Sequence, residues 1–326
     1  MFKIVSMFFY KKECYLLDKN IHWAGVNKLL AIFILLLVIT LYVPFIGLLA
    51  SLFLAYPFIV FTVKNETKFA VAFFGICLLL SLLLGGVLGV QMALQFGLTG
   101  IILGLGLKKH QSRIVTYFQG TVTFCVALVI NYLLIFYLFN VNLVEQYTSQ
   151  LSETINQGLS MYANLGITFD LLTIDSMLQL FVVFTPTIFL IFSASIVLIA
   201  ELVSYPLVRK QAIYVPKWPN FSTFMLPKSV FWYYLVLLLS SIFMEVQSTT
   251  LLYSVICNFE LVFQLLFYLQ GISFICYYSK QKDWKLIVPI FITIFSLLLP
   301  ILMYIIRLLG IIDLGFELRK LASRKK

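Results

Sequence analysis

Two groups of polar side chains lie inside otherwise apolar stretches, and in both groups the residues are four apart. The stretch 87–107 contains Gln91, Gln95 and Thr99. The stretch 250–278 contains Glu260 and Gln264. Residues four apart share one face of an α-helix, so each group forms a row of hydrogen-bonding side chains. Such a row can bind a small polar molecule, and we take all five residues as candidate ligand-binding residues.

Small residues form a second row on the stretch that carries the two glutamines. They are Gly85, Gly89, Ala93 and Gly97. A shorter row in the stretch 46–63 consists of Gly47, Ser51 and Ala55. Small residues at this spacing let a second backbone approach closely. Two interpretations therefore stay open for the stretch 87–107. It can pack against helices or a partner subunit, or its glutamines can border a ligand cavity.

Two acidic residues are expected inside membrane-spanning segments. Glu260 lies near the middle of its apolar stretch, where an ionisable group is costly and usually faces a cavity or a partner. It can be a proton or cation site, a ligand contact or a neutralised structural acid. Glu201 lies two helical turns before Arg209, and we expect it to pair with Arg209 or Lys210.

The composition indicates that these polar residues belong to a membrane protein. The chain is 62% hydrophobic and 11% charged, whereas soluble domains have roughly 25% charged residues. So few charges cannot cover a water-facing surface, so we expect a lipid bilayer around most of the chain. The net charge of +10 comes from short loops and the two ends, as in multi-spanning membrane proteins. No nucleic-acid partner is expected.

The apolar stretches predict an all-α, polytopic transmembrane helix bundle with eight or nine spans. A spanning helix needs about 20 apolar residues, and Pro44 and Gly85-Gly86 are expected to interrupt longer runs. The expected helices cover 29–43, 46–63, 69–84, 87–107, 115–139, 177–205, 229–246, 250–278 and 286–306. Leucines at helical spacing also predict a partly helical cap in the segment 140–175.

The distribution of charge predicts the orientation. No Lys or Arg occurs between Arg113 and Arg209, whereas five acidic residues do. Basic segments stay in the cytoplasm, so 140–175 is the expected external loop, and the N-terminal segment 1–28 is cytoplasmic. The other parts are a core (29–206), a cytoplasmic connector (207–228), C-terminal helices (229–312) and a basic tail (313–326).

The side of the basic tail stays open. Nine crossings would place it outside, against the charge rule. Either the first apolar run is one bent span, or one C-terminal segment does not cross. Residues 308–322 could also form an amphipathic helix lying at the interface.

Motifs for enzymatic chemistry are absent from the sequence. There is no GxxxxGK[ST], HExxH or GxSxG motif, and His22 and His110 both fall in expected cytoplasmic segments. The five cysteines form no CxxC pair. We therefore expect neither an enzyme nor a metal or cofactor site.

Several short motifs resemble the YybS-type family of uncharacterised bacterial multi-spanning membrane proteins, a domain of unknown function. They are Tyr42-Val43-Pro44-Phe45-Ile46-Gly47, Tyr56-Pro57-Phe58, Leu269-Gln270-Gly271 and the ending Leu309 to Lys320. The resemblance covers nearly the whole chain and implies location in a bacterial cell membrane. It implies no established activity.

The first six expected helices are more distantly similar to the S components of energy-coupling factor transporters. Those six-helix proteins capture a vitamin or related molecule and dock to a membrane subunit that is coupled to separate ATPases. The Pro-containing hairpin at 42–47 and the Gly-rich stretch 87–107 carry this similarity. The chain departs from it in its extra C-terminal helices and in lacking an Ala-xxx-Ala motif in the first helix.

Our leading hypothesis is a small-molecule-binding component of a transporter, with an S-component-like core of about six helices and no ATPase of its own. Its ligand is unknown, and its partners would be other membrane subunits. One alternative is a structural or interaction protein that uses the same small-residue faces for assembly. A further alternative is an ion-coupled carrier that uses Glu260.

Overall fold

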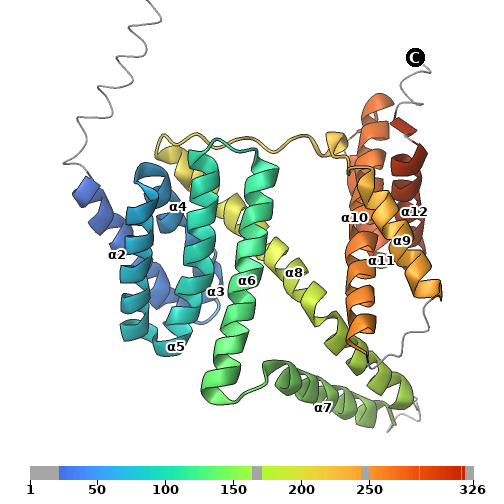
Figure 1. The fold of residues 1–326 in the computed structure, drawn as a ribbon, viewed down its shortest axis with the longest axis horizontal. Helices are drawn as coiled ribbons and strands as arrows, with labels where there is room; N and C mark the ends of the chain where they lie inside the picture. The colour runs from blue at the N-terminus through green and yellow to red at the C-terminus, as the bar shows by residue number, and fades with distance from the viewer. Residues whose placement is uncertain (1–21, 164–170, 244–249, 286, 317, 320–326) are drawn as a thin grey trace, which may run out of the picture. The chain divides into compact units, whose positions relative to one another are not determined.

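The computed structural model describes residues 22–163, 171–243, 250–285, 287–316 and 318–319, and these residues are helical almost throughout (Figure 1). No β-strand occurs within these ranges. The helices are α2 (His22–Tyr42), α3 (Ile46–Ser51), α4 (Ala55–Lys64), α5 (Thr67–Lys108), α6 (Arg113–Phe139), α7 (Leu143–Ala163), α8 (Leu171–Lys210), α9 (Ser229–Phe243), α10 (Leu251–Gln281), α11 (Ile287–Leu298) and α12 (Pro300–Phe316), with a short 3₁₀ helix at Phe221–Thr223.

The chain divides into two compact units, which are described separately. Unit 1 consists of residues 1–141 and 190–217, and unit 2 consists of residues 142–189 and 218–326. Helix α8 belongs to both, because its residues up to Phe189 are in unit 2 and the remainder are in unit 1.

Six helical segments of the described chain are long and apolar enough to cross a membrane. Many of their aliphatic side chains point away from the protein, and Leu83, for example, is 80% exposed. Exposed apolar surface on this scale needs a non-aqueous environment. The prediction of an all-helical chain with several long apolar helices is therefore confirmed.

The first long apolar run breaks at Pro44, as expected. Helix α2 ends at Tyr42, and Phe45 has a left-handed φ of 61° before α3 begins. The hydroxyl of Tyr42 donates a hydrogen bond to the carbonyl of Leu84, so this break contacts the end of another helical segment in unit 1. The expected helix 46–63 is itself divided into α3 and α4 by a turn at residues 52–54.

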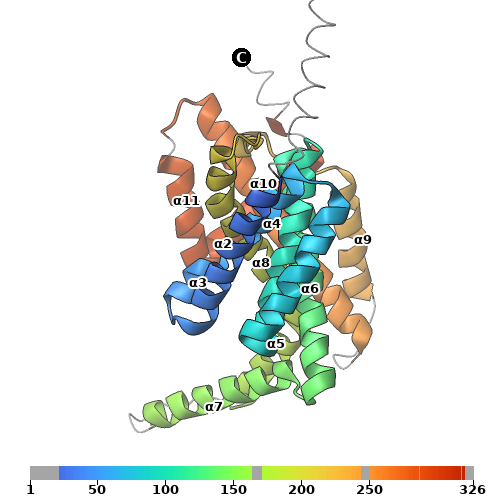
Figure 2. The same cartoon turned by 90° about the vertical axis from the view of Figure 1, so that its left-hand side faces the viewer.

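Helix α5 is a hairpin of two helices that turns at Gly86. A straight helix of 42 residues would be about 63 Å long, twice the thickness of the hydrocarbon core of a membrane. Gly86 adopts φ 55° and ψ −137°, a conformation that glycine adopts most readily. Beyond the turn, Gly89 lies against the carbonyl of Ser81 and Gly97 lies against the ring of Phe74. The two halves therefore run antiparallel (Figures 1 and 2), as the predicted turn at Gly85-Gly86 requires.

The core of unit 1 forms where α4 packs against the α5 hairpin. The rings of Phe58 and Phe73 meet edge to face with centroids 5.5 Å apart, and both are buried. The second half of α5 also packs against α4. A Cβ at Gly100 would lie only 2.7 Å from the carbonyl oxygen of Ala55, and a Cβ at Gly104 would lie 2.9 Å from the carbonyl oxygen of Ile59. Glycines in the second half of α5 thus bring the backbone of α4 into direct contact.

In unit 2, α10 and α12 cross at two glycines. Gly271 lies against the carbonyl of Ile306, and Gly310 lies against the carbonyl of Phe267. Farther along both helices, Arg319, which follows α12, donates to the hydroxyl of Ser273 and accepts at its carbonyl from the hydroxyl of Tyr277. The contacts advance in the same direction along the two helices, which therefore run parallel.

One expectation for this region is wrong. The segment 286–306 is not one helix, because α11 ends at Leu298 and α12 begins at Pro300. Proline lacks the backbone N–H that would continue the helix, which explains the break. The possible interfacial helix over 308–322 stays a prediction. Its residues up to Phe316 lie in α12, where Gly310, Asp313 and Leu314 are buried within unit 2.

The expected external cap is helical, as predicted. Helix α7 covers Leu143–Ala163, and α8 begins at Leu171, so the helix predicted over 177–205 is longer at both ends. Residues 164–170 of the predicted loop lie outside the described residues, as do 1–21 of the N-terminal segment and 320–326 of the basic tail.

Candidate functional site

Asn131 of α6 contacts the second half of α5 in unit 1, on the helix that carries the predicted residues Gln91 and Gln95. Asn131 on α6 is 5% exposed and donates a 3.4 Å hydrogen bond from Nδ2 to the backbone carbonyl of Gln91. Its side-chain oxygen Oδ1 is buried and has no hydrogen-bond partner among the described residues. The partly buried side chain of Gln91 lies one turn before that of Gln95. A buried acceptor without a partner is unfavourable, so this group is suited to receiving a donor from a bound molecule.

Thr99, the third member of the predicted row, lies in a different environment. It is 1% exposed, and its hydroxyl donates a 2.7 Å hydrogen bond to the carbonyl of Gln95. A threonine that bonds to the carbonyl four residues earlier satisfies its hydroxyl within its own helix. Thr99 therefore contributes packing and a local hydrogen bond, whereas the two glutamine side chains extend the polar row.

The small residues of the two predicted rows make close contacts inside the chain. Gly85 lies against Leu41, Gly89 against Ser81 and Gly97 against Phe74. Ala93 and Ala55 are fully buried. A Cβ at Gly47 would lie 2.6 Å from the carbonyl oxygen of Thr40, and the Ser51 hydroxyl donates to the carbonyl of Leu48. These faces are covered by the protein's own helices.

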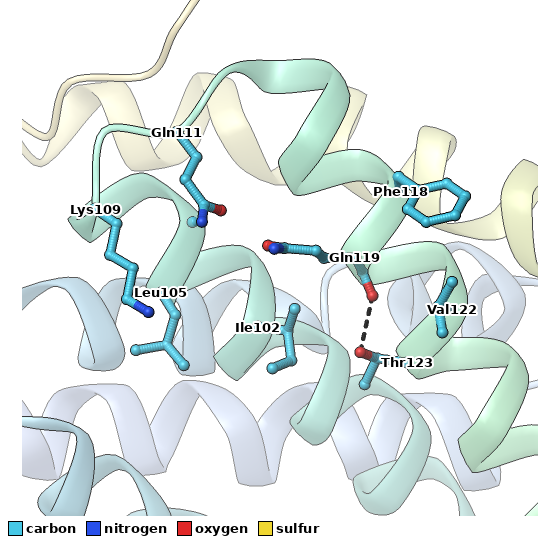
Figure 3. Close-up of a pocket in the computed structure, with 9 residues that line it drawn as sticks. Ile102, Leu105, Lys109, Gln111, Phe118, Gln119, Val122 and Thr123 are labelled. Atoms are coloured by element: carbon cyan, nitrogen blue, oxygen red, sulfur yellow. Dashed lines mark hydrogen bonds between the residues drawn. The ribbon is translucent and has the colours of Figure 1, made fainter.

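A groove of about 380 Å³ lies between α5 and α6, near the loop that joins these two helices (Figure 3). The side-chain amides of Gln111 and Gln119 point into it, and Lys109 lies at its edge. The Oε1 atom of Gln111 is buried, and no described residue is its hydrogen-bond partner. Apolar side chains including Ile102 and Phe118 form the walls. The volume falls in the range of about 300–1,000 Å³ that is usual for small-molecule sites.

One row of α6 links the groove to Asn131. Gln119, Thr123, Ala127 and Asn131 follow each other at four-residue spacing, so they share one face of the helix. We call this face, with Gln91 and Gln95 of α5, the amide seam. Sequence reasoning missed Asn131 and Gln119, although their spacing on one helix was a signal that could have identified them.

The second predicted pair, Glu260 and Gln264, lies in unit 2 on α10. Gln264 Nε2 donates a 3.0 Å hydrogen bond to Glu260 Oε1, and both residues are half-buried. They are neighbours on one helix face, as their spacing predicted. The two predicted groups thus belong to separate units of the chain.

A polar cluster in unit 2 lies at Pro186 of α8, where Asn258 on α10 inserts its carboxamide. Asn258 Oδ1 accepts from the backbone N–H of Thr187 at 3.0 Å, while its Nδ2 donates to the carbonyl of Val183 at 2.7 Å. These two groups pair with each other in an uninterrupted α-helix, so the side chain bridges the opened helix.

Glu201 does not pair as predicted. Its carboxylate accepts a 3.1 Å hydrogen bond from Arg113, 88 residues earlier in the chain, and Tyr205 donates to the same carboxylate at 3.3 Å. Arg113 also lies over the ring of Tyr205, 4.9 Å from its centroid. The expectation that Glu201 pairs with Arg209 or Lys210 is therefore wrong, because the helix carries this carboxylate into the core while both basic residues remain exposed.

A second buried charged cluster connects α10, α12 and the segment 221–226 in unit 2. Asp313 is fully buried and accepts from Gln270 at 2.6 Å and from Arg319 at 3.0 Å. Arg319 also donates to the carbonyl of Ser222. The two sequence segments that carried the family resemblance in this unit, Leu269-Gln270-Gly271 and the C-terminal motif, are thus in direct contact.

The described part of the chain contains no group of three or more His, Cys, Asp or Glu side chains placed to hold a metal ion.

Comparison with known proteins agrees with a helical membrane chain. The protein is similar to the "Uncharacterized protein YybS" of Bacillus subtilis (strain 168), with 22% identity over 295 residues, covering 89% of this chain and 95% of the relative. No solved structure matches it. The model of the family "Predicted membrane protein (DUF2232)" matches residues 31–314, which is most of the chain, so the protein belongs to this family of membrane proteins.

Proposed function

We propose that this protein is a small-molecule-binding component of a membrane transporter, and that the ligand binds at the amide seam of unit 1. The observation that carries the proposal is the carboxamide of Asn131, whose Oδ1 is buried without a partner among the described residues and whose Nδ2 donates to the backbone carbonyl of Gln91. A folded protein gains stability by pairing such a group, and a ligand donor can supply the pair.

The chemistry of the seam favours a neutral polar ligand. Each amide side chain offers both a donor and an acceptor, and Gln91, Gln95 and Asn131 carry no charge. A molecule with alternating donors and acceptors, such as a nucleobase or a heterocyclic vitamin, matches this pattern. Absence of a P-loop motif from the sequence fits a subunit whose energy comes from a separate ATPase.

The alternative of an assembly protein receives less support. It would use the small-residue faces for docking, but Gly89 and Gly97 lie against Ser81 and Phe74 of the same chain. For the carrier alternative, Glu260 already accepts a hydrogen bond from Gln264. Neither contact leaves an unpaired buried group comparable to Asn131.

We also propose a bacterial cell membrane as the location and an orientation with both chain ends in the cytoplasm. Counting the halves of α5 separately and α3–α4 as one segment, α2 to α6 make five passes and α8 to α10 make three, whereas α11, with 12 residues, is too short to cross alone, so α11 and α12 enter and return to the same side as a pair. An even number returns the basic tail to the side of the N-terminus, as the positive-inside rule requires. Cysteines introduced at exposed Lys282 and Glu145 should be labelled from opposite sides of the membrane.

The binding proposal is tested by thermal unfolding of the purified protein with a panel of nucleobases, vitamins and amino acids. A ligand at a hundredfold excess over its Kd stabilises the folded state by about 2.7 kcal/mol. The variants Gln91→Leu/Gln95→Leu and Asn131→Leu should lose this shift. Gln264→Leu, the same chemical change in unit 2, should keep it. If no compound shifts the unfolding temperature, or if only Gln264→Leu removes the shift, the proposed site is wrong.

A further inference from the structure

A second cavity, in unit 2, lies where α10 ends. Its volume is about 460 Å³, and it is bordered by the C-terminal end of α10, the turn that follows it and the 3₁₀ segment at Phe221–Thr223. Ser279 lines this cavity. This residue is 3% exposed, yet its hydroxyl oxygen is buried and finds no hydrogen-bond partner in the part of the chain that the structure describes. As with Asn131, a ligand can supply the missing partner.

Two opposite charges accompany this hydroxyl. Lys280 follows Ser279 directly, and Asp283 lies in the turn after α10, where its left-handed φ of 54° reverses the chain. Both side chains line the cavity and are exposed at its mouth. Neither forms a salt bridge within the described residues. The cavity therefore offers a cation and an anion together, with a neutral hydroxyl inside.

The position of the cavity relates it to the membrane surface. It lies at the end of α10, one of the helices long and apolar enough to span the membrane. Trp284 is 49% exposed at its edge, and tryptophan is enriched at the level of lipid headgroups. Beyond it, α11 presents Ile287 and Phe291, which are 68% and 64% exposed. Acyl chains can lie along this apolar face while a headgroup occupies the cavity.

We infer that this cavity binds the headgroup of a zwitterionic phospholipid, and specifically a phosphoethanolamine group. The phosphate is paired with Lys280 and accepts a hydrogen bond from the hydroxyl of Ser279. The ammonium group is paired with Asp283. An anionic headgroup such as phosphoglycerol would satisfy Lys280 but would place no cation against Asp283. The quaternary ammonium of phosphocholine cannot donate a hydrogen bond to the carboxylate.

Native mass spectrometry with lipids of identical acyl chains tests this inference. The wild-type protein should bind phosphatidylethanolamine in preference to phosphatidylglycerol and phosphatidylcholine. Lys280→Gln should weaken binding of phosphatidylethanolamine by about tenfold or more, because a charge-assisted hydrogen bond is lost. Asp283→Asn should abolish the preference over phosphatidylglycerol, and Ser279→Ala should weaken binding of all three lipids. The control Lys282→Gln changes a neighbouring exposed lysine that does not line the cavity, and it should behave like wild type.

Three outcomes would overturn the inference. Equal effects of Lys280→Gln and Lys282→Gln would indicate unspecific attraction to the basic turn. If the wild-type protein shows no headgroup preference, Asp283 does not select the ammonium group. Equal affinity for water-soluble glycerophosphoethanolamine and for the lipid would identify a soluble ligand in place of a membrane lipid.

Discussion

The carboxamide of Asn258 pairs with the backbone of Thr187 at the proline kink of α8, accepting from its N–H and from its hydroxyl. The same carboxamide donates to the carbonyl of Val183. One side chain thus replaces a backbone hydrogen bond of another helix. This arrangement holds α8 and α10 together within unit 2 by polar contacts in a region where most other side chains are apolar.

Replacing Asn258 by Leu should destabilise the protein by about 1–3 kcal/mol, because Thr187 and Val183 lose their partners in a buried place. The change is measured by thermal or denaturant unfolding in detergent. In a Pro186→Ala background the helix can close its own hydrogen bonds, so the cost of the same replacement should be smaller. Equal costs in both backgrounds would contradict the bridging role.

The buried pair of Arg113 and Glu201 predicts a pattern of single and double effects. Replacing Arg113 by Met or Glu201 by Leu leaves one charge without its partner and should cost about 3–5 kcal/mol. The double replacement should recover much of that loss. As a control, Glu66→Gln removes an exposed pair with Lys68, which is worth at most about 1 kcal/mol. Additive single effects in unfolding measurements would show that the two charges do not interact.

The glycine crossing of α10 and α12 should not accept a side chain. A methyl group at Gly271 or Gly310 would collide with a backbone carbonyl of the other helix, so alanine there forces the helices apart. We expect a loss of at least about 2 kcal/mol, in the range seen for overpacked cores. Gly75→Ala on α5 is the control, because its new Cβ would meet no atom within 4 Å. A helical alanine at that position should be neutral or stabilising. Similar effects at Gly75 and Gly271 would mean that the crossing is not tight.

The cluster around Asp313 should control how firmly the segment 221–226 is held. Replacing Asp313 by Leu removes the acceptor shared by Gln270 and Arg319, and Leu226 is bonded to that same glutamine. We expect faster trypsin cleavage at Lys228, compared with an unchanged rate at Lys108 and Lys109 in unit 1. An unchanged rate at Lys228 would mean that other contacts hold the segment.

The features that could be predicted from the sequence were local ones. Pro44 and Gly86 mark chain breaks because each restricts or permits backbone angles at its own position. Spacing of four residues placed Glu260 beside Gln264 and put small residues on the faces that pack. Helix existence followed from length and apolarity, since a bilayer requires about 20 residues per crossing.

Features that depend on distant partners could not be predicted in this way. Glu201 has basic residues close in sequence, but its partner is Arg113, and only the packed helices bring the two together.

The break before Pro300 is a local feature that the sequence analysis missed, although proline itself was a visible signal. Apolarity on both sides of it, from Ile287 to Ile306, concealed two short helices within a run that resembles one long span.

The hairpin of α5 also bears on the order in which the chain can acquire its structure. Its two halves meet across a single turn, so every contact between them joins residues that leave the ribosome within a few seconds of each other. Contacts this close in sequence form quickly. The hairpin can therefore enter the bilayer as a closed pair, with its glycines already packed, before α6 has been synthesised. The surface of α5 that carries Gln91 and Gln95 is then already folded when α6 packs against the hairpin.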